Sequence, residues 1–190
     1  MGGRVKICGL TEEATIETAL TAGADYGGVV LGPARRQVPW ETARRWAERY
    51  PRRLVAVLRG AAPEVWERLG EVPWAGIQVY DAPRPDWVKW ARSQGWLAIC
   101  PSGPGQPPVA DVWLLETSRP GTGERLDWWR VERPATRFWL AGGLTPENVA
   151  EAVRALAPDG VDVSSGVEIE GRKDRERVRE FVRRAREAMG

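Results

Sequence analysis

Histidine is missing from this sequence of 190 residues. Its absence excludes a Ser–His–Asp triad, a Cys–His pair and every metal site built on imidazole. Cysteine occurs only at Cys8 and Cys100, which is too few for a disulfide framework or a cysteine metal cluster. Acid–base chemistry in this chain must therefore rest on cysteine, aspartate, glutamate, lysine or tyrosine.

An excess of either charge is also missing. The chain has 28 basic and 26 acidic residues, so its net charge is +2 and it has no broad electrostatic footprint for nucleic acid or an anionic membrane. No apolar run approaches the length of a membrane span, and the first residues lack the apolar segment of a signal peptide. We therefore expect a cytoplasmic protein without nucleic-acid or membrane partners.

The chain does contain a regular alternation of short β-rich runs and amphipathic helical stretches. We expect strands at Val5–Cys8, Tyr26–Leu31, Leu54–Leu58, Ala75–Tyr80, Trp96–Cys100, Val112–Leu115, Arg137–Ala141 and Val161–Val163. We expect helices over residues 12–22, 40–50, 63–69, 85–94, 145–156 and 174–189, whereas residues 101–110 are rich in Pro and Gly, so any helix there is short or missing.

Eight strands alternating with helices favour a closed parallel barrel. We therefore predict an α/β protein with a (β/α)₈ TIM-barrel fold in one compact domain, residues 1–190. The rival is a doubly wound open sheet. No G-x-G-x-x-G pattern follows the first strand and no P-loop pattern occurs, which weakens that rival.

Chemistry in such a barrel belongs at the C-terminal ends of the strands. Cys8 ends the first strand and alternates onto the same face as Lys6, whose charge suits the lumen, so we expect Cys8 to point inward at the active-site end. The alternative is a buried cysteine that acts as a small hydrophobe. Asp162 should face the lumen near Lys6, either as its ion-pair partner or as a contact for substrate hydroxyls.

Two small-residue turns follow the seventh and eighth strands. They contain Gly142 and Gly143 in one turn, and Ser164, Ser165 and Gly166 in the other. Loops at these two strand ends commonly bind phosphate through backbone N–H groups and a helix N-terminus. We expect Thr145 to cap the helix that follows the first of these turns, with Pro146 in its first turn.

Two acidic residues compete for the site. Asp127 lies in the long loop after the sixth strand, where it either caps a short helix or serves as a site carboxylate, and Glu116 follows the sixth strand directly. Arg35 and Arg36, after the second strand, supply cationic groups for a carboxylate, and Gln78 lies near the end of the fourth strand.

Four segments resemble, in order, motifs of the phosphoribosylanthranilate isomerases. Residues 5–11 resemble the opening K-I-C-G-[IL]-T, and residues 126–128 resemble F-D-W. Residues 140–149 resemble the phosphate loop after the seventh strand of the family, and residues 161–168 resemble its eighth-strand motif. The matches extend from the first strand to the last helix.

The resemblance implies an Amadori rearrangement in tryptophan biosynthesis, in which an aminoaldose phosphate becomes an aminoketose phosphate without a metal or organic cofactor. It implies that Asp127 is the general acid and the Cys8 thiolate is the general base. Arg36 would hold the anthranilate carboxylate. The implied substrate-binding residues are Arg36, Gln78, Gly142, Gly143, Asp162, Ser164, Ser165 and Gly166.

The chain also departs from the family pattern. Ala34 replaces a serine of S-x-R, Tyr80 replaces the histidine of Q-L-H-G, and Glu116 replaces the aspartate of L-L-D. Two other functions stay open. One is a related sugar-phosphate enzyme such as indoleglycerol-phosphate synthase, whose chemistry needs a catalytic lysine, and the other is a non-catalytic barrel that binds a phosphorylated metabolite. The sequence also leaves a homodimer open.

Overall fold

The strands form a closed barrel in which each is hydrogen-bonded to the next in chain order and the last pairs with the first. The computed structural model describes residues 2–81, 86–102, 109–116, 128, 131 and 133–190. The barrel strands are β1 (Arg4–Ile7), β2 (Tyr26–Val30), β3 (Leu54–Leu58), β4 (Gly76–Val79), β5 (Leu97–Ser102), β6 (Val112–Leu115), β7 (Phe138–Leu140) and β8 (Gly160–Val163). All pairs are parallel, so the predicted (β/α)₈ fold is confirmed.

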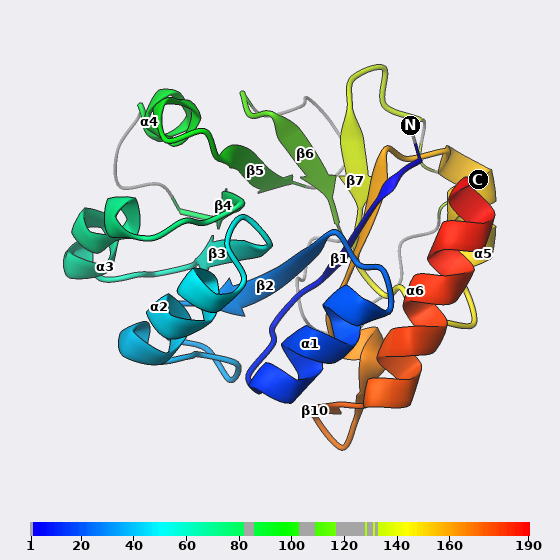
Figure 1. The fold of residues 1–190 in the computed structure, drawn as a ribbon. Helices are drawn as coiled ribbons and strands as arrows, with labels where there is room; N and C mark the ends of the chain where they lie inside the picture. Colours follow the sequence, from blue (N-terminus) through cyan, green and yellow to red (C-terminus); the bar gives the residue numbers. More distant parts are fainter. Residues whose placement is uncertain (1, 82–85, 103–108, 117–127, 129–130, 132) are drawn as a thin grey trace.

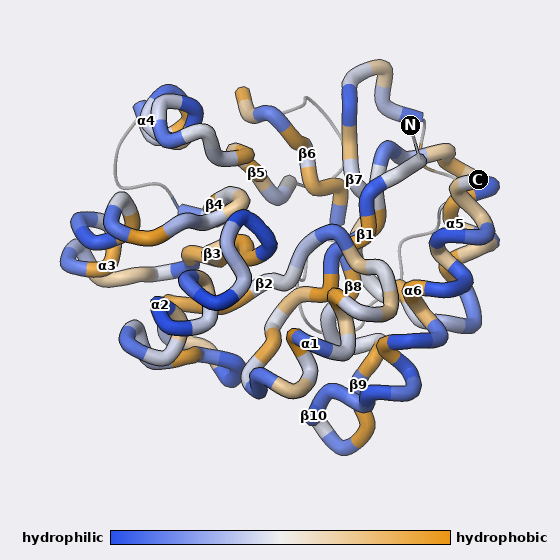
Figure 2. The backbone as a smooth tube through the Cα atoms, in the orientation of Figure 1, coloured by the Kyte–Doolittle hydropathy of each residue, from blue (hydrophilic) through white to orange (hydrophobic). Residues whose placement is uncertain are grey.

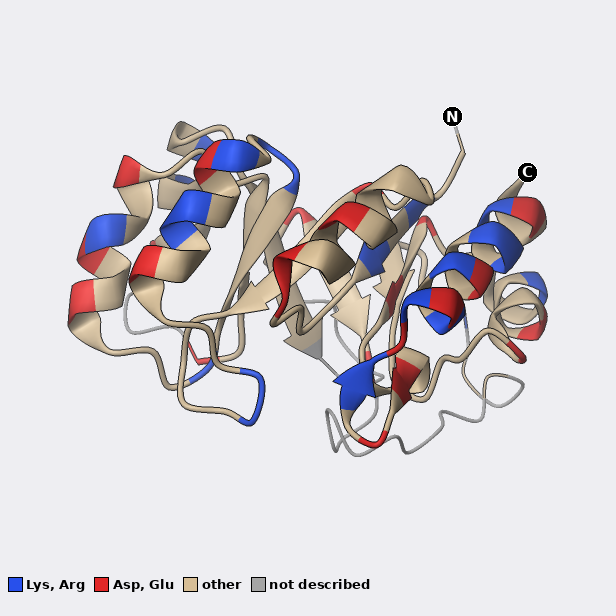
Figure 3. Ribbon diagram, turned by 60° about the horizontal axis from the view of Figure 1, so that its bottom comes forward, with Lys and Arg blue, Asp and Glu red and all other residues tan. Residues whose placement is uncertain are grey.

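Helices surround the barrel, as Figure 1 shows. They are α1 (Glu13–Thr21), α2 (Trp40–Arg49), α3 (Pro63–Arg68), α4 (Trp87–Ser93), α5 (Val149–Leu156) and α6 (Arg175–Met189), with 3₁₀ turns η1 (Leu69–Glu71) and η2 (Ser165–Val167). Charged residues concentrate on the helices, whereas the strands are largely free of them (Figure 3). None of the described helices is both long and apolar enough to cross a membrane.

The alternation of side chains along each strand produces two apolar layers. In β3, Leu54 and Leu58 pack outward under the helices, whereas Val55 packs inward. The inner layer also contains Leu114 and Trp139, and the Trp139 ring stacks on Tyr26 with centroids 5.7 Å apart. Apolar residues follow the strands through the centre of the molecule (Figure 2). The filled lumen leaves the carboxyl ends of the strands as the place for a cavity.

One local expectation was wrong, and one local feature was not predicted. Helix α5 begins at Val149, because the Asn148 side chain accepts from the Thr145 amide (2.7 Å) and donates to the Gly143 carbonyl (2.9 Å). This turn, rather than a Thr145 cap, precedes the helix. The sequence also gave no sign of the short antiparallel hairpin formed by β9 (Glu168–Ile169) and β10 (Arg172–Lys173). This hairpin brings two charged side chains back to the barrel mouth.

Candidate active site

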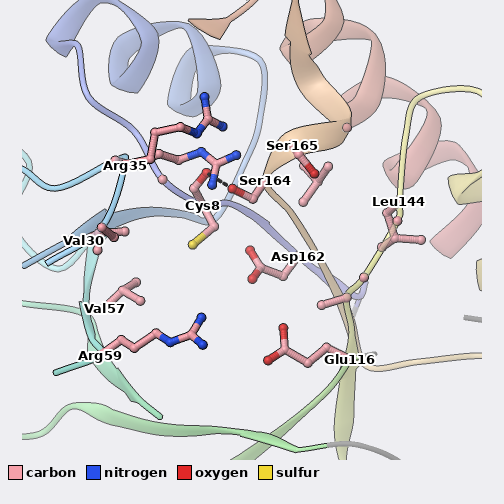
Figure 4. A pocket seen from close by; sticks show the side chains of 18 of the residues that line it. Cys8, Val30, Arg35, Val57, Arg59, Glu116, Leu144, Asp162, Ser164 and Ser165 are labelled. Atoms are coloured by element: carbon pink, nitrogen blue, oxygen red, sulfur yellow. Dashed lines mark hydrogen bonds between the residues drawn. The ribbon is translucent and has the colours of Figure 1, made fainter. Parts of the chain in front are cut away.

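A cavity of about 160 Å³ lies at the carboxyl ends of the strands. The structure brings most of the predicted site residues to its wall, and Figure 4 shows the side chains of Cys8, Glu116 and Asp162 directed into it. The predicted residues that line the cavity are Cys8, Arg36, Gly142, Gly143, Asp162, Ser164, Ser165 and Gly166. Gln78 is buried and belongs to the support below the cavity. Asp127 lies outside the described residues.

The Cys8 thiol occupies space that a glycine on the next strand leaves free. A Cβ atom at Gly28 would lie 2.9 Å from Cys8 Sγ, so a larger residue there would displace the thiol. Burial raises the pKa of the thiol, while the nearby ammonium groups of Lys6 and Lys173 oppose that rise. Cys8 is therefore mainly the protonated thiol at neutral pH.

Beneath the cavity, a buried hydrogen-bonded chain links three strands. Lys6 Nζ lies 3.0 Å from both carboxylate oxygens of Asp162 and donates to Gln78 Oε1 at 2.8 Å. Gln78 Nε2 in turn donates to the Tyr80 hydroxyl at 3.1 Å. The expected Lys6–Asp162 pair is therefore present, and Gln78 connects it to Tyr80 on the cavity wall.

Glu116 is the carboxyl group that the structure places across the cavity mouth from Cys8 (Figure 4). Glu116 is buried, with 7 % of its surface exposed. Burial, together with the negative charge of Asp162, raises the pKa of Glu116 to about 7, although Lys6, Tyr80 and Arg59 act in the opposite direction. A carboxyl with this pKa is protonated in a large fraction of molecules at neutral pH, so Glu116 can donate a proton.

The two small-residue turns meet closely on the β7–β8 side. A Cβ atom on Gly166 would lie 1.7 Å from the Leu144 carbonyl oxygen, so only glycine allows this approach. Gly142 and Gly143 have φ angles of +79° and +67°, which also favour glycine. The η2 turn begins at Ser165, directly before Gly166. The arrangement suits an anion such as phosphate.

A second glutamate at the mouth is tightly paired. Glu168 accepts from Arg36 Nε at 2.6 Å and Nη2 at 3.0 Å, from Arg35 Nη2 at 2.7 Å and from Lys173 Nζ at 2.7 Å. Burial alone would raise its pKa, but the hydrogen bonds from these cations lower the pKa of Glu168 to about 2. Arg36 therefore lines the cavity, and two of its guanidinium N–H donors are already hydrogen-bonded to the Glu168 carboxylate.

Sequence reasoning missed the roles of Glu168 and Lys173, and it noted Tyr80 only as a departure. Glu168 and Lys173 meet because β9 and β10 pair, and no local pattern revealed that hairpin. Arg59, just past β3, was missed as well. Its position one residue beyond a strand end was the available signal.

The fold and the cavity define a (β/α)₈ barrel equipped for proton transfer on a small molecule that carries an anionic group. Comparison with known proteins narrows this class. The family model for N-(5'-phosphoribosyl)anthranilate (PRA) isomerase matches residues 104–184. The enzyme named N-(5'-phosphoribosyl)anthranilate isomerase from Streptococcus pneumoniae (strain Hungary19A-6) is 36% identical over 98% of this chain and 97% of its own length.

Solved structures agree with this relation. The isomerase of that name from Pyrococcus furiosus is 29% identical, with a TM-score of 0.77 over 97% of this chain and 99% of its own. A phosphoribosyl anthranilate isomerase in complex with reduced 1-(o-carboxyphenylamino)-1-deoxyribulose 5-phosphate is 28% identical, with a TM-score of 0.71 over 96% of this chain and 98% of its own. The chain belongs to the N-(5'-phosphoribosyl)anthranilate isomerase family.

Proposed function

We propose that this barrel mouth converts N-(5-phosphoribosyl)anthranilate to 1-(2-carboxyphenylamino)-1-deoxyribulose 5-phosphate, the Amadori rearrangement of tryptophan biosynthesis. One observation carries the assignment of roles: the Cys8 thiol and the Glu116 carboxyl face one cavity, and the two small-residue turns form its β7–β8 side. The relative that was solved with the reduced product supports a ligand of this chemistry.

The reaction needs one proton donor and one proton acceptor on a substrate held by its phosphate. The acid protonates the furanose ring oxygen, and the ring opens to an iminium. Cys8 as thiolate then removes the C2′ proton, the electron pair moves toward the iminium nitrogen, and an enolamine forms that tautomerises to the ketone. The positively charged nitrogen eases the loss of the C2′ proton, so the chain needs a base of moderate strength only.

Within the described residues, Glu116 fits the acid role. Its pKa of about 7 keeps a proton available near neutral pH, and it lines the same cavity as Cys8. Asp127 stays a prediction from the sequence motif. The two assignments differ in one test, because Glu116→Gln and Asp127→Asn each remove a proton donor without changing the size of the side chain.

The resting protonation states have a kinetic consequence. The active form needs protonated Glu116 and ionised Cys8, yet the pKa of Glu116 is near 7 and that of the Cys8 thiol is raised by burial. The fraction of molecules with both protonated Glu116 and ionised Cys8 is small at every pH. It passes through a broad maximum between the two pKa values. We therefore expect kcat/KM to rise through pH 7 and to fall above the raised thiol pKa.

The phosphate is proposed to bind between Gly142–Gly143 and Ser164–Gly166. Two side chains hold the second turn in place: Lys173 Nζ donates to the Ser164 carbonyl at 2.9 Å, and Ser164 Oγ donates to the Cys8 carbonyl at 3.1 Å. The same contacts tie the phosphate turn to the base. A crystal with bound product that places the phosphate elsewhere would contradict this assignment.

The decisive experiment follows the fluorescence of phosphoribosylanthranilate during its consumption. We expect turnover by the wild type and by Cys100→Ala, and a loss of ~10²–10⁴-fold in kcat for Cys8→Ala with product affinity retained. Cys100 is the matched control because it is the second cysteine and lies half-buried outside the cavity wall. Wild-type turnover by Cys8→Ala would contradict the mechanism.

Two further properties belong to the proposal. A phosphorylated substrate carries charge that opposes passage through a membrane, which supports action in the cytoplasm. A relative from Thermotoga maritima, 29% identical with a TM-score of 0.74, is described as dimeric, and we propose that this chain also pairs with itself. Light scattering on the eluted protein, with a mass near 42 kDa rather than the chain mass of 21.1 kDa, would support a dimer.

A further inference from the structure

Two buried lysines act on the Cys8 thiol, and their charges are balanced differently. Lys6, in β1, has a carboxylate to itself, since both oxygens of Asp162 lie 3.0 Å from its Nζ. Lys173 reaches the site from β10, and its side chain is 4 % exposed. Burial and the charge of Asp162 raise the pKa of Cys8, whereas the two ammonium groups lower it. Tyr80 lines the same cavity, and burial raises its pKa, so it stays neutral.

Lys173 belongs to a cluster with an excess of positive charge. Its Nζ donates to Glu168 Oε1 at 2.7 Å, and the same carboxylate accepts from Arg35 and Arg36. Within these four side chains, three cations therefore share one anion. Because the Lys173 side chain is buried, water screens its charge only weakly, and its field extends to neighbouring groups. Lys6, by contrast, is largely neutralised by its own carboxylate.

Hydrogen bonds identify Lys173 as an ammonium group. Its Nζ has three acceptors: the Glu168 carboxylate, the Ser164 carbonyl at 2.9 Å and the Ser164 hydroxyl oxygen at 3.4 Å. That hydroxyl donates its hydrogen to the Cys8 carbonyl at 3.1 Å, so it can only accept from Lys173. Burial lowers the pKa of Lys173, but Glu168 opposes this, and three acceptors require the three N–H groups of the charged form.

We propose that Lys173 is a positioning residue for the general base: it holds the Ser164 turn beside Cys8 and stabilises the Cys8 thiolate by its charge. The proposal rests on the function proposed above, in which this thiolate removes the C2′ proton. A buried cation near a thiol favours the ionised form. Below the thiol pKa, a larger thiolate fraction gives a proportionally faster proton transfer.

Arg177 offers a matched control on the same turn. Its Nε and Nη2 donate to the Gly166 carbonyl at 3.3 and 3.2 Å, so it also ties this turn to a cation. Unlike Lys173, Arg177 has a side chain that is 32 % exposed, and it pairs with Glu147 at 3.0 Å. Water screens such a charge strongly. Loss of Arg177 therefore loosens the turn without removing a buried cation.

The experiment measures the rate of alkylation by iodoacetamide from pH 6 to pH 10 in the Cys100→Ala background, where Cys8 is the only cysteine. The thiolate is the reactive form, so the midpoint of the profile follows the thiol pKa without substrate or turnover. We expect Lys173→Met to move the midpoint to higher pH and to lower the rate at pH 7 about tenfold. Arg177→Met should keep the midpoint of the Cys100→Ala parent. Glu116 lines the same cavity and titrates near pH 7, and this contribution is common to all variants.

A second variant separates charge from hydrogen bonding. Lys173→Gln keeps an N–H donor for the Ser164 carbonyl but has no charge, so it should move the midpoint in the same direction as Lys173→Met. Both variants should fold, because Glu168 keeps Arg35 and Arg36 as partners and no buried carboxylate is left unpaired.

An unchanged midpoint in Lys173→Met and Lys173→Gln overturns the proposal. An equal shift in Arg177→Met also overturns it, since loosening of the turn would then be the cause, and so does a shift in Lys173→Met that is absent from Lys173→Gln. Turnover by the wild type tests the proposed function separately. A midpoint that depends on Lys173 in a protein without turnover would support the action of Lys173 on the thiol and remove the reaction.

Discussion

Two glutamates at one barrel mouth differ in pKa by about five pH units. Glu168, next to β8, accepts hydrogen bonds from three cationic side chains and has a pKa of about 2. Glu116, next to β6, is buried near the carboxylate of Asp162 and has a pKa of about 7. The same side chain is thus a permanent anion on one side of the cavity and a titrating acid on the other.

The difference separates two tasks. On the β8 side, charges are paired and geometry is held, which suits binding of a phosphate of constant charge. On the β3–β6 side, burial and the charge of Asp162 hold the pKa of Glu116 near 7, so this carboxyl can exchange a proton near neutral pH. The function proposed above therefore requires a carboxyl at this mouth whose charge is not fixed by cations.

The largest expected effect is on catalysis. Glu116→Gln should lower kcat by ~10²–10⁴-fold, because an amide cannot donate the proton that opens the ring. It should also remove the limb of the pH profile near pH 7, so that the residual rate rises with pH toward the thiol pKa. Steady-state rates from pH 5 to pH 10 check both results. An inflection near pH 7 that persists in Glu116→Gln but vanishes in Asp127→Asn would assign the acid to the loop.

The next effect is on the paired glutamate. Glu168→Gln should destabilise the protein by about 3 kcal/mol at pH 7, because Lys173 and two arginines lose their common counterion. The depressed pKa means that this stabilisation is present above about pH 4 and is lost as the pH falls through about 2. Urea unfolding at pH 7 and pH 3 measures the change.

Glu170 gives the matched control for that variant. It lies in the same hairpin turn, is exposed, and Glu170→Gln should leave the free energy of unfolding nearly unchanged. An equal loss of stability in both variants would show that the hairpin, rather than the charge cluster, is responsible.

A smaller effect of opposite sign is expected at Glu116. Its raised pKa means that stability is fully present below the pKa of the unfolded chain, about 4.3, and declines as the pH rises through about 7. Glu116→Gln should therefore unfold at the same temperature as the wild type near pH 4 but be more stable at pH 9, by roughly 1–3 kcal/mol. Thermal unfolding at the two pH values would contradict this if the difference were constant.

The smallest effect belongs to a glutamate on the surface of α6. Hydrogen bonds from Arg183 and Arg184 lower the pKa of Glu180 to about 2, the same value as for Glu168. Water and salt screen this cluster, so Glu180→Gln should barely shift the unfolding midpoint, and 1 M salt should abolish the shift. The Glu168→Gln effect should persist in that salt.

We also expect residues 1–190 to unfold as one cooperative unit. β1 pairs with β8, and α6 packs against both α1 and α5, so the two ends of the chain share one set of contacts. Coincident transitions in far-UV and tryptophan signals would support a single domain. Separate transitions would contradict it.

Regular features of the fold were predictable because they depend on local pattern. The apolar run Leu54–Leu58 matches β3 at both ends, and alternation alone placed Lys6 and Asp162 together in the lumen. The inward direction of the Cys8 side chain followed from the same alternation. These predictions succeeded because successive side chains of a strand point to opposite faces, and in a closed barrel one of these faces always forms the lumen.

Partner-dependent features were not predictable. The guanidinium of Arg36 is hydrogen-bonded to Glu168, which is 132 residues away in sequence. The β9–β10 hairpin, with only two paired residues in each strand, brings Glu168 to this position. The pKa of Glu116 depends on burial and on the charge of Asp162, and neither can be read from the sequence next to Glu116. Thr145 is a residue type that often caps helices, but the Asn148 side chain stabilises a different turn before α5.

Closure of the barrel between its first and last strands has a consequence for synthesis. Lys6 is 0 % exposed and has its counterion on Asp162, while the Cys8 amide donates to the Val163 carbonyl at 2.8 Å. A chain still emerging from a ribosome, N-terminus first, has made β1 long before β8 exists. Until then β1 is an edge strand with an unpaired ammonium, and burial of that charge is unfavourable. The nascent chain therefore completes the environment of the Cys8 thiol in a late folding step, after β8 has left the ribosome.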